Sequence, residues 1–466
     1  MNVLYLHTHD TGRAVSPYGF SVKTPNYEKF CEENLLFQNV FCVAPTCSPS
    51  RAGLLTGCYP HQNGMLGLAQ RGFELDTEKH LVKFLKNHGF HTVLSGVQHE
   101  YAYYLDHEIA KEPLGYEEDI SADHTQYDEA DLIYWDMENA DSVCRWLDSY
   151  AGDKPFFLSY GMHCTHRKFP KTIDEEINVD FCQPPAWVVN NQISREDYAH
   201  YKTSVRIADD NVGKVINKLR EKNLYDNTIV VLTTDHGLAY PFGKCTLKDT
   251  GIGVLFAMHC PNAELKSHNY DGLISHIDVF PTLCELLDLQ KPAYLEGRSF
   301  ADIFRGKDYS GDEQIFAEIN FHTSYEPVRC IRTERYKYIR FFDNGYNKLN
   351  YSNIDNSPLK TFLNEHQLIE YTKPLEALYD LFFDPTENNN VIHEARYEDV
   401  IGKLRSELEA IMAKTQDPLL DGPIEIKPEW KVNQRYCYSP GSKNPEDYVS
   451  MGDTKLNRFH KKEAEQ

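Results

Sequence analysis

The stretch TIVVLTTDHG, residues 228–237, is apolar almost throughout before it ends in Asp-His-Gly. Such a run is typical of a strand that is covered on both faces of a parallel sheet. Three further runs share this pattern: NVLYLHT from Asn2, HTVLSGV from His91 and PFFLSYGM from Pro155. Helical stretches such as EKHLVKFLKNHG and DDNVGKVINKLREKN lie between them and end in glycine or polar residues. This alternation predicts an α/β sandwich with a largely parallel central sheet.

A second pattern begins after the segment GRSFADIFRG, near Arg298. The run CIRTERYKYIRFF alternates like an antiparallel strand, and EALYDLFFDPTENNNV is typical of a strand that leaves through a turn. An apolar helical period starts at about Glu398, and the tail from about Pro423 is polar. We therefore expect a large domain over residues 1–310. A smaller C-terminal α+β domain, with a short antiparallel sheet and the polar tail, is expected over residues 311–466.

The composition excludes several classes of protein. A formal charge of −22 on 466 residues argues against a nucleic-acid or anionic-membrane surface, but not against a locally positive pocket for a small anion. The sequence contains no apolar run of about 18 residues, so we expect no transmembrane helix. The twelve cysteines form no CxxC pair, which favours buried thiols in a reducing compartment over disulfides or a zinc ribbon. The start MNVLYLHTHD lacks signal-peptide features, so we expect a cytoplasmic chain with no nucleic-acid or membrane partner.

Polar residues follow the predicted strands at the points where the strands end. They are His9, Asp10, His99, His163, His166, Asp235 and His236. Ligands of open α/β sheets bind at the carboxyl ends of the strands. The sequence therefore predicts a polar site at this edge of the sheet.

The stretch TCSPSRAGLLTG, residues 46–57, places a cysteine just ahead of an apolar helical run. Pro49 suits the first turn of a helix, so Cys47 is expected at or just before a helix N-terminus, where backbone amides favour anions. Arg51 is expected to project back toward Cys47 with a fork of donors that suits sulfate or phosphate. The ordinary alternative for a cysteine is a buried free thiol.

Cys47-Ser48-Pro49-Ser50-Arg51, followed by LLTG, resembles the C-x-P-x-R signature of sulfatases. The longer stretch CSPSRAGLLTGCYPHQNGMLGL resembles the heparan N-sulfatase (sulfamidase) branch. The segments GVQHEY, HCTHR, TTDHGLAYPFGK and ALYDLFFDPTENNN follow in the same order as that branch's landmarks. The resemblance implies an alkaline-phosphatase-like fold and makes residues 1–310 the catalytic domain. It also implies that a formylglycine-generating enzyme oxidises Cys47 to formylglycine, whose hydrate attacks sulfur with one hydroxyl and expels sulfate with the other.

The resemblance also implies a divalent metal, usually calcium, beside the formylglycine. His9 and Asp10 stand where the family commonly carries Asp-Asp, and Asp235 and His236 stand where many members carry Asp-Asn. With Cys47 these residues are the expected metal ligands, although strand-end polar residues also cap helices. Calcium prefers oxygen ligands, whereas imidazole suits manganese or zinc, so two bound histidines would disfavour calcium. Either histidine could instead lie just outside the ligand shell, and the sequence predicts only a divalent metal.

Three further residues match positions of the family's catalytic machinery. His99 stands at the histidine of the G-K-x-H motif, which would take the proton from the hydroxyl that expels sulfate. The lysine of that motif is replaced by Val97. His166 matches the residue that protonates the leaving group or holds the sulfate, and Lys244 matches a lysine that neutralises charge in the transition state. Taken alone, a strand-end histidine and a solvated lysine would be the ordinary interpretations.

Weaker candidates and rival functions remain open. His163 is a secondary candidate beside His166, and His7, Arg13, Arg71 and residues 322–326 are candidates for bordering the substrate. The main hypothesis is a sulfatase that hydrolyses the sulfate ester or N-sulfate of a sulfated saccharide. A phosphonate monoester or phosphodiester hydrolase is the first alternative, because its Asp-His pair resembles the one at residues 235–236. A non-catalytic sugar-binding relative is the second, supported by Val97 and His9.

Overall fold

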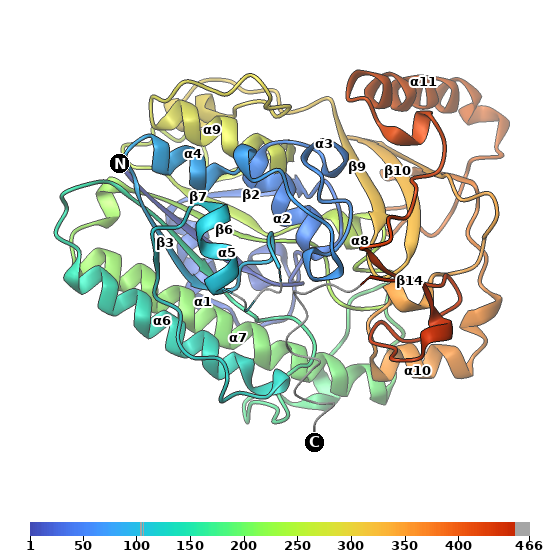
Figure 1. The fold of residues 1–466 in the computed structure, drawn as a ribbon, viewed down its shortest axis with the longest axis horizontal. Helices are drawn as coiled ribbons and strands as arrows, with labels where there is room; N and C mark the ends of the chain where they lie inside the picture. Colours follow the sequence, from blue (N-terminus) through green and yellow to red (C-terminus); the bar gives the residue numbers. More distant parts are fainter. Residues whose placement is uncertain (103–104, 106, 453–466) are drawn as a thin grey trace.

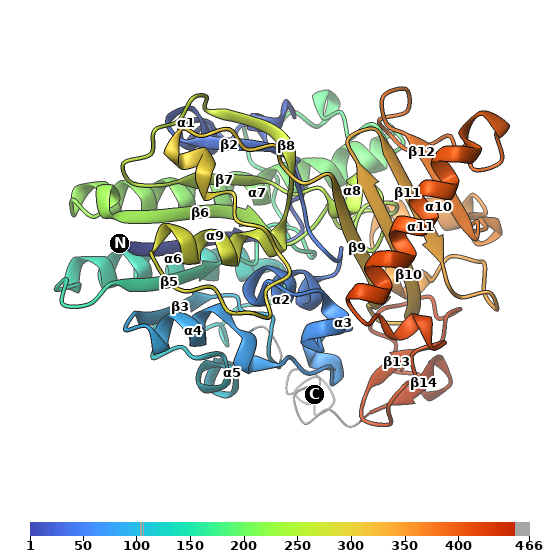
Figure 2. The same cartoon turned by 90° about the horizontal axis from the view of Figure 1, so that it is seen from above.

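The computed structural model describes residues 1–102, 105 and 107–452, and an eight-stranded sheet forms its centre (Figures 1 and 2). The strand order is β4-β3-β5-β1-β6-β7-β2-β8, and β7 alone runs antiparallel to its neighbours. The strands are β1 (Asn2–Thr8), β2 (Leu35–Phe41), β3 (His91–Gly96), β4 (Glu118–Asp119), β5 (Phe156–Gly161), β6 (Thr228–Thr234), β7 (Phe256–His259) and β8 (Asn269–Ser275). The predicted α/β fold with a largely parallel sheet is confirmed.

The four runs that predict strands are β1, β3, β5 and β6, and they lie next to one another in the order β3-β5-β1-β6. Alternate side chains of these strands enter two different hydrophobic clusters. Leu4 and Leu6 pack with α1 (Pro25–Glu33), α6 (Leu132–Ser149) and α7 (Gln192–Glu221). Val3 and Tyr5 pack on the opposite face with α2 (Cys47–Thr56), α4 (Leu81–Asn87) and α9 (Val279–Leu286). Because helices cover both faces, these strands contain few polar positions.

Figure 1 shows this layering, with α6 and α7 below the sheet and α4 and α9 above it. The run DDNVGKVINKLREKN falls in the second half of the 30-residue helix α7. The remaining α-helices are shorter or lie in the C-terminal part. They are α3 (Pro60–Asn63), α5 (His107–Leu114), α8 (Asp249–Ile252), α10 (Pro358–Glu365) and α11 (Glu398–Lys414).

A four-stranded antiparallel sheet lies beside the main sheet, on the right in Figure 2. Its order is β12 (Glu376–Asp380), β11 (Tyr336–Phe341), β10 (Tyr325–Thr333) and β9 (Gln314–Phe321). The run CIRTERYKYIRFF therefore spans parts of two strands, because the chain bends at residues 334–335. Phe316 and Ile331 pack under α11, whereas Ile315 and Cys330 join the cluster of the main domain. This sheet is therefore covered on both faces.

The polar tail is folded as far as the described residues extend. β13 (Lys431–Asn433) pairs with β14 (Tyr448–Met451), and the ring of Trp430 stacks on that of Phe73 at 4.4 Å. Arg71 donates hydrogen bonds to the carbonyl oxygens of Lys431 and Pro440. Aromatic packing and this arginine hold the segment against the main domain rather than leaving it frayed. Residues 453–466 of the predicted tail lie outside the described residues.

The structure can be compared with two expectations from the composition: buried free thiols and no transmembrane helix. All twelve cysteines are buried as free thiols, as their irregular spacing predicts. Among the described residues, every helix is too short or too polar to cross a lipid bilayer.

Candidate active site

The two pairs of candidate ligands, His9-Asp10 and Asp235-His236, follow the adjacent parallel strands β1 and β6. Thr8 at the end of β1 lies opposite Thr234 at the end of β6, so the residues that follow emerge side by side. The backbone N–H of Asp10 donates a hydrogen bond of 2.8 Å to Oδ1 of Asp235. Asp10 has a φ of 56°, in the left-handed region that a non-glycine residue adopts at a cost of roughly 1–3 kcal/mol. Such strain clusters at functional sites, and here it accompanies the hydrogen bond from the Asp10 backbone to Asp235.

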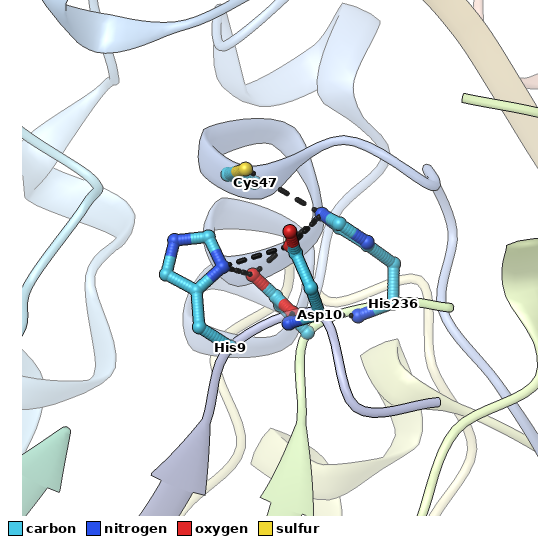
Figure 3. A group of neighbouring side chains, drawn as sticks. His9, Asp10, Cys47 and His236 are labelled. Carbon is cyan, nitrogen blue, oxygen red and sulfur yellow. Dashed lines mark hydrogen bonds and ion pairs between the residues drawn. The ribbon is translucent and has the colours of Figure 1, made fainter. Parts of the chain in front are cut away.

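Two imidazoles and a thiol surround these carboxylates (Figure 3). Nδ1 of His9 lies 2.9 Å from Oδ1 of Asp10 and 3.1 Å from Oδ2 of Asp235. Nε2 of His236 lies 3.3 Å from Oδ1 of Asp10 and 3.5 Å from Sγ of Cys47. One ligand atom from each of these five residues lies within 4.8 Å of the others. The structure therefore brings all five expected ligands together.

The chemistry of this donor set fits a divalent cation. Buried carboxylates require a compensating charge, and the Asp10 and Asp235 side chains are fully buried. Carboxylate oxygens suit calcium, whereas two imidazole nitrogens suit manganese or zinc better. Burial by itself raises the pKa of Asp10, but Lys244, His166 and His236 outweigh it and hold this pKa well below its ordinary value. Both carboxylates are therefore ionised in this site.

Cys47 is the first residue of α2, as its sequence neighbourhood predicts. Burial raises the pKa of its thiol well above the ordinary value, so the unmodified side chain is uncharged at neutral pH. Arg51 lies one turn further along the helix. Its guanidinium donates to Oδ2 of Asp235 at 3.0 Å and to the carbonyl oxygen of Thr8 at 3.1 Å, and it contacts His7. Its fork of donors is thus directed at Asp235 and the end of β1.

Lys244 lies in the loop between β6 and α8, and it enters the same site. Its Nζ is 2.9 Å from Oδ2 of Asp10 and 3.1 Å from Oδ2 of Asp355. Burial by itself lowers the pKa of Lys244, but the two carboxylates raise it well above the ordinary value. Lys244 is therefore a buried cation. Asp355 comes from the C-terminal part of the chain, and no motif in the sequence points to it.

The candidate proton-transfer histidines follow β3 and β5. Nε2 of His99 lies 2.9 Å from Oε1 of Gln70, and its ring centroid is 5.7 Å from that of His9. Burial lowers the pKa of His99 well below the ordinary value, which keeps the ring neutral. The His166 ring lies 4.5 Å from that of His9, and its Nε2 is 3.9 Å from Oδ2 of Asp10. The His166 side chain is 20% exposed, in contrast to the buried His99.

His163 is buried, and its ring lies 5.3 Å from that of His166. The backbone N–H groups of His163 and Cys164 each donate a 2.8 Å hydrogen bond to the carboxylate of Asp136 on α6. This helix therefore fixes the start of the loop that carries His166. Val97, at the position of the family's lysine, packs with Trp135 in a separate apolar cluster. Its side chain serves the core rather than the site.

The weaker candidates separate into three groups. His7 contacts Arg51 and Ser159, so it helps to hold the Arg51 side chain in place. Arg13 donates to the carbonyl oxygen of Val40 and lies over the Phe41 ring, and Arg71 holds the C-terminal hairpin. Within the described part of the chain, these interactions direct both arginines away from the ligand cluster. Of residues 322–326, His322 is buried among charged groups of the site, whereas Glu326 pairs with Lys373 at 2.8 Å.

Comparison with known families agrees with this arrangement. The sulfatase family model matches residues 1–289, and the model of the N-sulphoglucosamine sulphohydrolase C-terminal region matches residues 235–367. The chain belongs to the sulfatase family and is a sulfuric ester hydrolase. An ulvan-active sulfatase of Formosa agariphila is 27% identical over 87% of this chain and 78% of its own length. Human N-sulphoglucosamine sulphohydrolase is 25% identical over 91% of this chain and 93% of its own length.

Solved structures show the same fold. The structure of BT4656 in complex with its substrate D-glucosamine-2-N,6-O-disulfate has a TM-score of 0.67 at 18% identity, covering 91% of this chain and 99% of that one. The phosphonate monoester hydrolase of Agrobacterium radiobacter has a TM-score of 0.68 at 19% identity, covering 92% of this chain and 100% of that one. The fold is therefore shared by enzymes that act on different acid esters.

Proposed function

We propose that this enzyme removes a sulfate group from a sulfated saccharide after Cys47 has been converted to formylglycine by a formylglycine-generating enzyme. The observation that carries the proposal is the position of Cys47, at the start of α2 and within 4.8 Å of two carboxylates and two imidazoles. The names of the relatives supply the substrate class, since they include sulfatases of ulvan and of N-sulphoglucosamine. We further propose residues 1–310 as the catalytic domain and residues 311–466 as the smaller domain.

His9, Asp10, Asp235 and His236 would hold a divalent metal against residue 47. When bound, this metal would polarise a sulfate oxygen and lower the pKa of the attacking hydroxyl. The mixed oxygen and nitrogen donors lead us to propose manganese or zinc beside calcium as candidates. Metal analysis of protein purified from its native host tests the identity of this ion.

The chain's own residues would divide the remaining tasks. The hydrate of the formylglycine supplies two hydroxyls on one carbon, one to attack sulfur and one to expel sulfate. His99, which is buried and neutral, would accept the proton of the second hydroxyl. His166, which is partly exposed, would donate a proton to the leaving oxygen or nitrogen of the sugar. Lys244 and Arg51 would balance the negative charge of the bound sulfate.

The test combines mass spectrometry with kinetics on a panel of defined sulfated monosaccharides. We expect the peptide that contains Cys47 to carry the formylglycine mass when the chain is made together with a formylglycine-generating enzyme. This preparation should hydrolyse at least one sugar of the panel, whereas Cys47→Ala should be inactive. A fully converted, metal-loaded enzyme that hydrolyses none of them would overturn the proposal. An unmodified thiol and no bound metal in protein from the native host would instead support the non-catalytic sugar-binding alternative.

A phosphonate monoester or phosphodiester hydrolase remains the second candidate function. It is favoured by the Asp235-His236 pair and by the likeness of the fold to a phosphonate monoester hydrolase. Turnover of an aryl sulfate and of an aryl phosphonate ester on the same converted preparation separates the two functions. A clear preference for the phosphonate would replace the sulfatase proposal with this one.

A further inference from the structure

Two side chains from the C-terminal part of the chain reach the candidate site. His322 directly follows β9, and Asp355 follows the short 3-10 helix Tyr351–Asn353. Both belong to the region beside the four-stranded sheet rather than to the main sheet that carries the five candidate ligands. Asp355 pairs with Lys244, and His322 directly precedes two residues that hydrogen-bond to the segment before Asp355.

Asp355 is an ionised acceptor in a place where an anion is expected to bind. Its Oδ2 lies 3.1 Å from Nζ of Lys244, and its side chain is 16% exposed. Burial by itself raises the pKa of Asp355, but Lys244 outweighs it and lowers this pKa below its ordinary value. Among the described residues, Oδ2 is buried and accepts no hydrogen bond of good geometry. Beside its ion pair with Lys244, the Asp355 carboxylate thus retains the capacity to accept a hydrogen bond.

His322 provides a second observation at the same place. Its side chain is 4% exposed, and within the described part of the chain its Nδ1 is buried without a hydrogen-bond partner. The backbone N–H groups of the next two residues, Thr323 and Ser324, donate to Oδ1 of Asn353 at 3.1 and 2.9 Å, which holds His322 beside the segment that carries Asp355. A buried polar atom without a partner is costly, and a ligand group that bonded to this Nδ1 would remove that cost.

Asp355 pairs with Lys244, but a carboxylate beside a sulfate site also weakens the binding of the sulfate itself, and its remaining acceptor capacity points to a second role. Asp355 accepts hydrogen bonds and cannot donate them when ionised, and the groups of a saccharide that donate are its hydroxyls and amino groups. We infer that Asp355 and His322 bind a hydroxyl or amino group of the sugar next to the sulfated position and thereby select the substrate. This inference deepens the proposed sulfatase function and rests on it. It makes the C-terminal part the source of substrate specificity.

The test compares a sulfated monosaccharide that the wild-type enzyme hydrolyses with analogues in which each neighbouring hydroxyl or amino group is replaced by hydrogen. We expect Asp355→Ala to lower kcat/KM for the parent sugar by roughly 10- to 100-fold, the usual value of a hydrogen bond to a charged group. For one of the deoxy analogues, the same substitution should change kcat/KM by less than about threefold, because the partner group is already missing. Asp355→Asn should fall between wild type and Asp355→Ala, and His322→Gln should show the same dependence on the substrate.

The control is Asn356→Ala, which removes an exposed neighbour that bonds to Ser439 and accepts a hydrogen bond from Lys360. Lys360 keeps three backbone carbonyl acceptors, so this variant should leave both substrates unaffected. An equal loss on the parent sugar and on every analogue would show that Asp355 acts only by positioning Lys244, and it would overturn the inference. A loss below threefold on the parent sugar would also overturn it. Failure of the proposed function is seen separately, because the wild-type enzyme would then hydrolyse no member of the panel. Activity of each variant on the deoxy analogue also shows that it is folded.

Discussion

A buried ion pair fixes the loop that carries His166, and its removal is expected to cost both stability and activity. The guanidinium of Arg167 donates to both carboxylate oxygens of Asp197 on α7, at 2.8 and 2.6 Å. Its Nε also donates to the carbonyl oxygen of Ala239, in the loop that leads to Lys244. The pair therefore ties two segments of the site to one long helix.

The size of the effect follows from burial. The Arg167 and Asp197 side chains are 9% and 6% exposed, and removal of one partner of such a pair costs about 3–5 kcal/mol because the other charge stays buried. An unfolding entropy of about 2.1 cal/mol/K per residue amounts to about 1 kcal/mol per kelvin for a chain of this length. Arg167→Met should therefore lower the melting temperature by about 3–5 °C. A shift of about 1 Å in the neighbouring His166 should lower kcat/KM by about 100-fold.

The assay is a double-mutant cycle with Arg167→Met, Asp197→Asn and the combined variant, followed by thermal melts and by turnover of an accepted sulfated sugar. The combined variant should be more stable than the sum of the single effects implies, since no charge is left unpaired. Lys23→Met is the control, because the Lys23–Glu176 pair has a similar distance of 2.9 Å but side chains that are 72% and 59% exposed. Because water screens that exposed pair, Lys23→Met should melt close to the wild-type temperature. A melting temperature of Arg167→Met within 1 °C of wild type would refute the reasoning.

Three further predictions concern the metal, the pH dependence and a glycine. Chelation should abolish activity, and Asp235→Asn should reduce the bound metal measured by elemental analysis; full activity of metal-free enzyme would contradict this. Burial by itself lowers the pKa of His61, but the Glu318 carboxylate at 2.7 Å raises it above the ordinary value. The stabilising effect of this pair is thus complete at pH values below about 6.5 and is lost as the pH rises through the raised pKa. The difference in melting temperature between wild type and His61→Gln should therefore shrink as the pH rises from about 6.5 through the raised pKa of His61. A difference that stays constant with pH would show that the His61–Glu318 ion pair does not cause it. Gly161→Ala would place its Cβ 2.0 Å from a backbone carbonyl oxygen and should yield insoluble or strongly destabilised protein. Gly402→Ala, with nothing within 4 Å of the added carbon, should be stabilising by about 0.4–1 kcal/mol in the same melts.

Much of the fold can be predicted from local patterns. Strands buried on both faces are apolar along their whole length, and the four that adjoin the site, β1, β3, β5 and β6, are recognisable for this reason. Parallel neighbours share one carboxyl edge, so the residues after β1 and β6 are expected to meet, as Asp10 and Asp235 do. The start of α2 at Cys47 follows from Pro49 and the apolar run behind it. The β10–β11 hairpin is harder to predict, because one alternating run contains two strands and the bend between them.

The sequence by itself thus determined the class of fold, and it predicts the edge of the sheet at which the candidate site lies and Cys47 as its central residue. The fold class and the edge depend on periodicity, whereas Cys47 depends on its neighbours along the chain and on the family resemblance that they carry. Only the tertiary structure decided that Arg51 binds Asp235, and that Lys244 is shared between Asp10 and Asp355. Such contacts join residues more than a hundred positions apart. The first two depend on how α2 and the loop after β6 pack at the edge of the main sheet, and the third depends on how the C-terminal part packs against it. Packing of this kind leaves no regular spacing in the sequence.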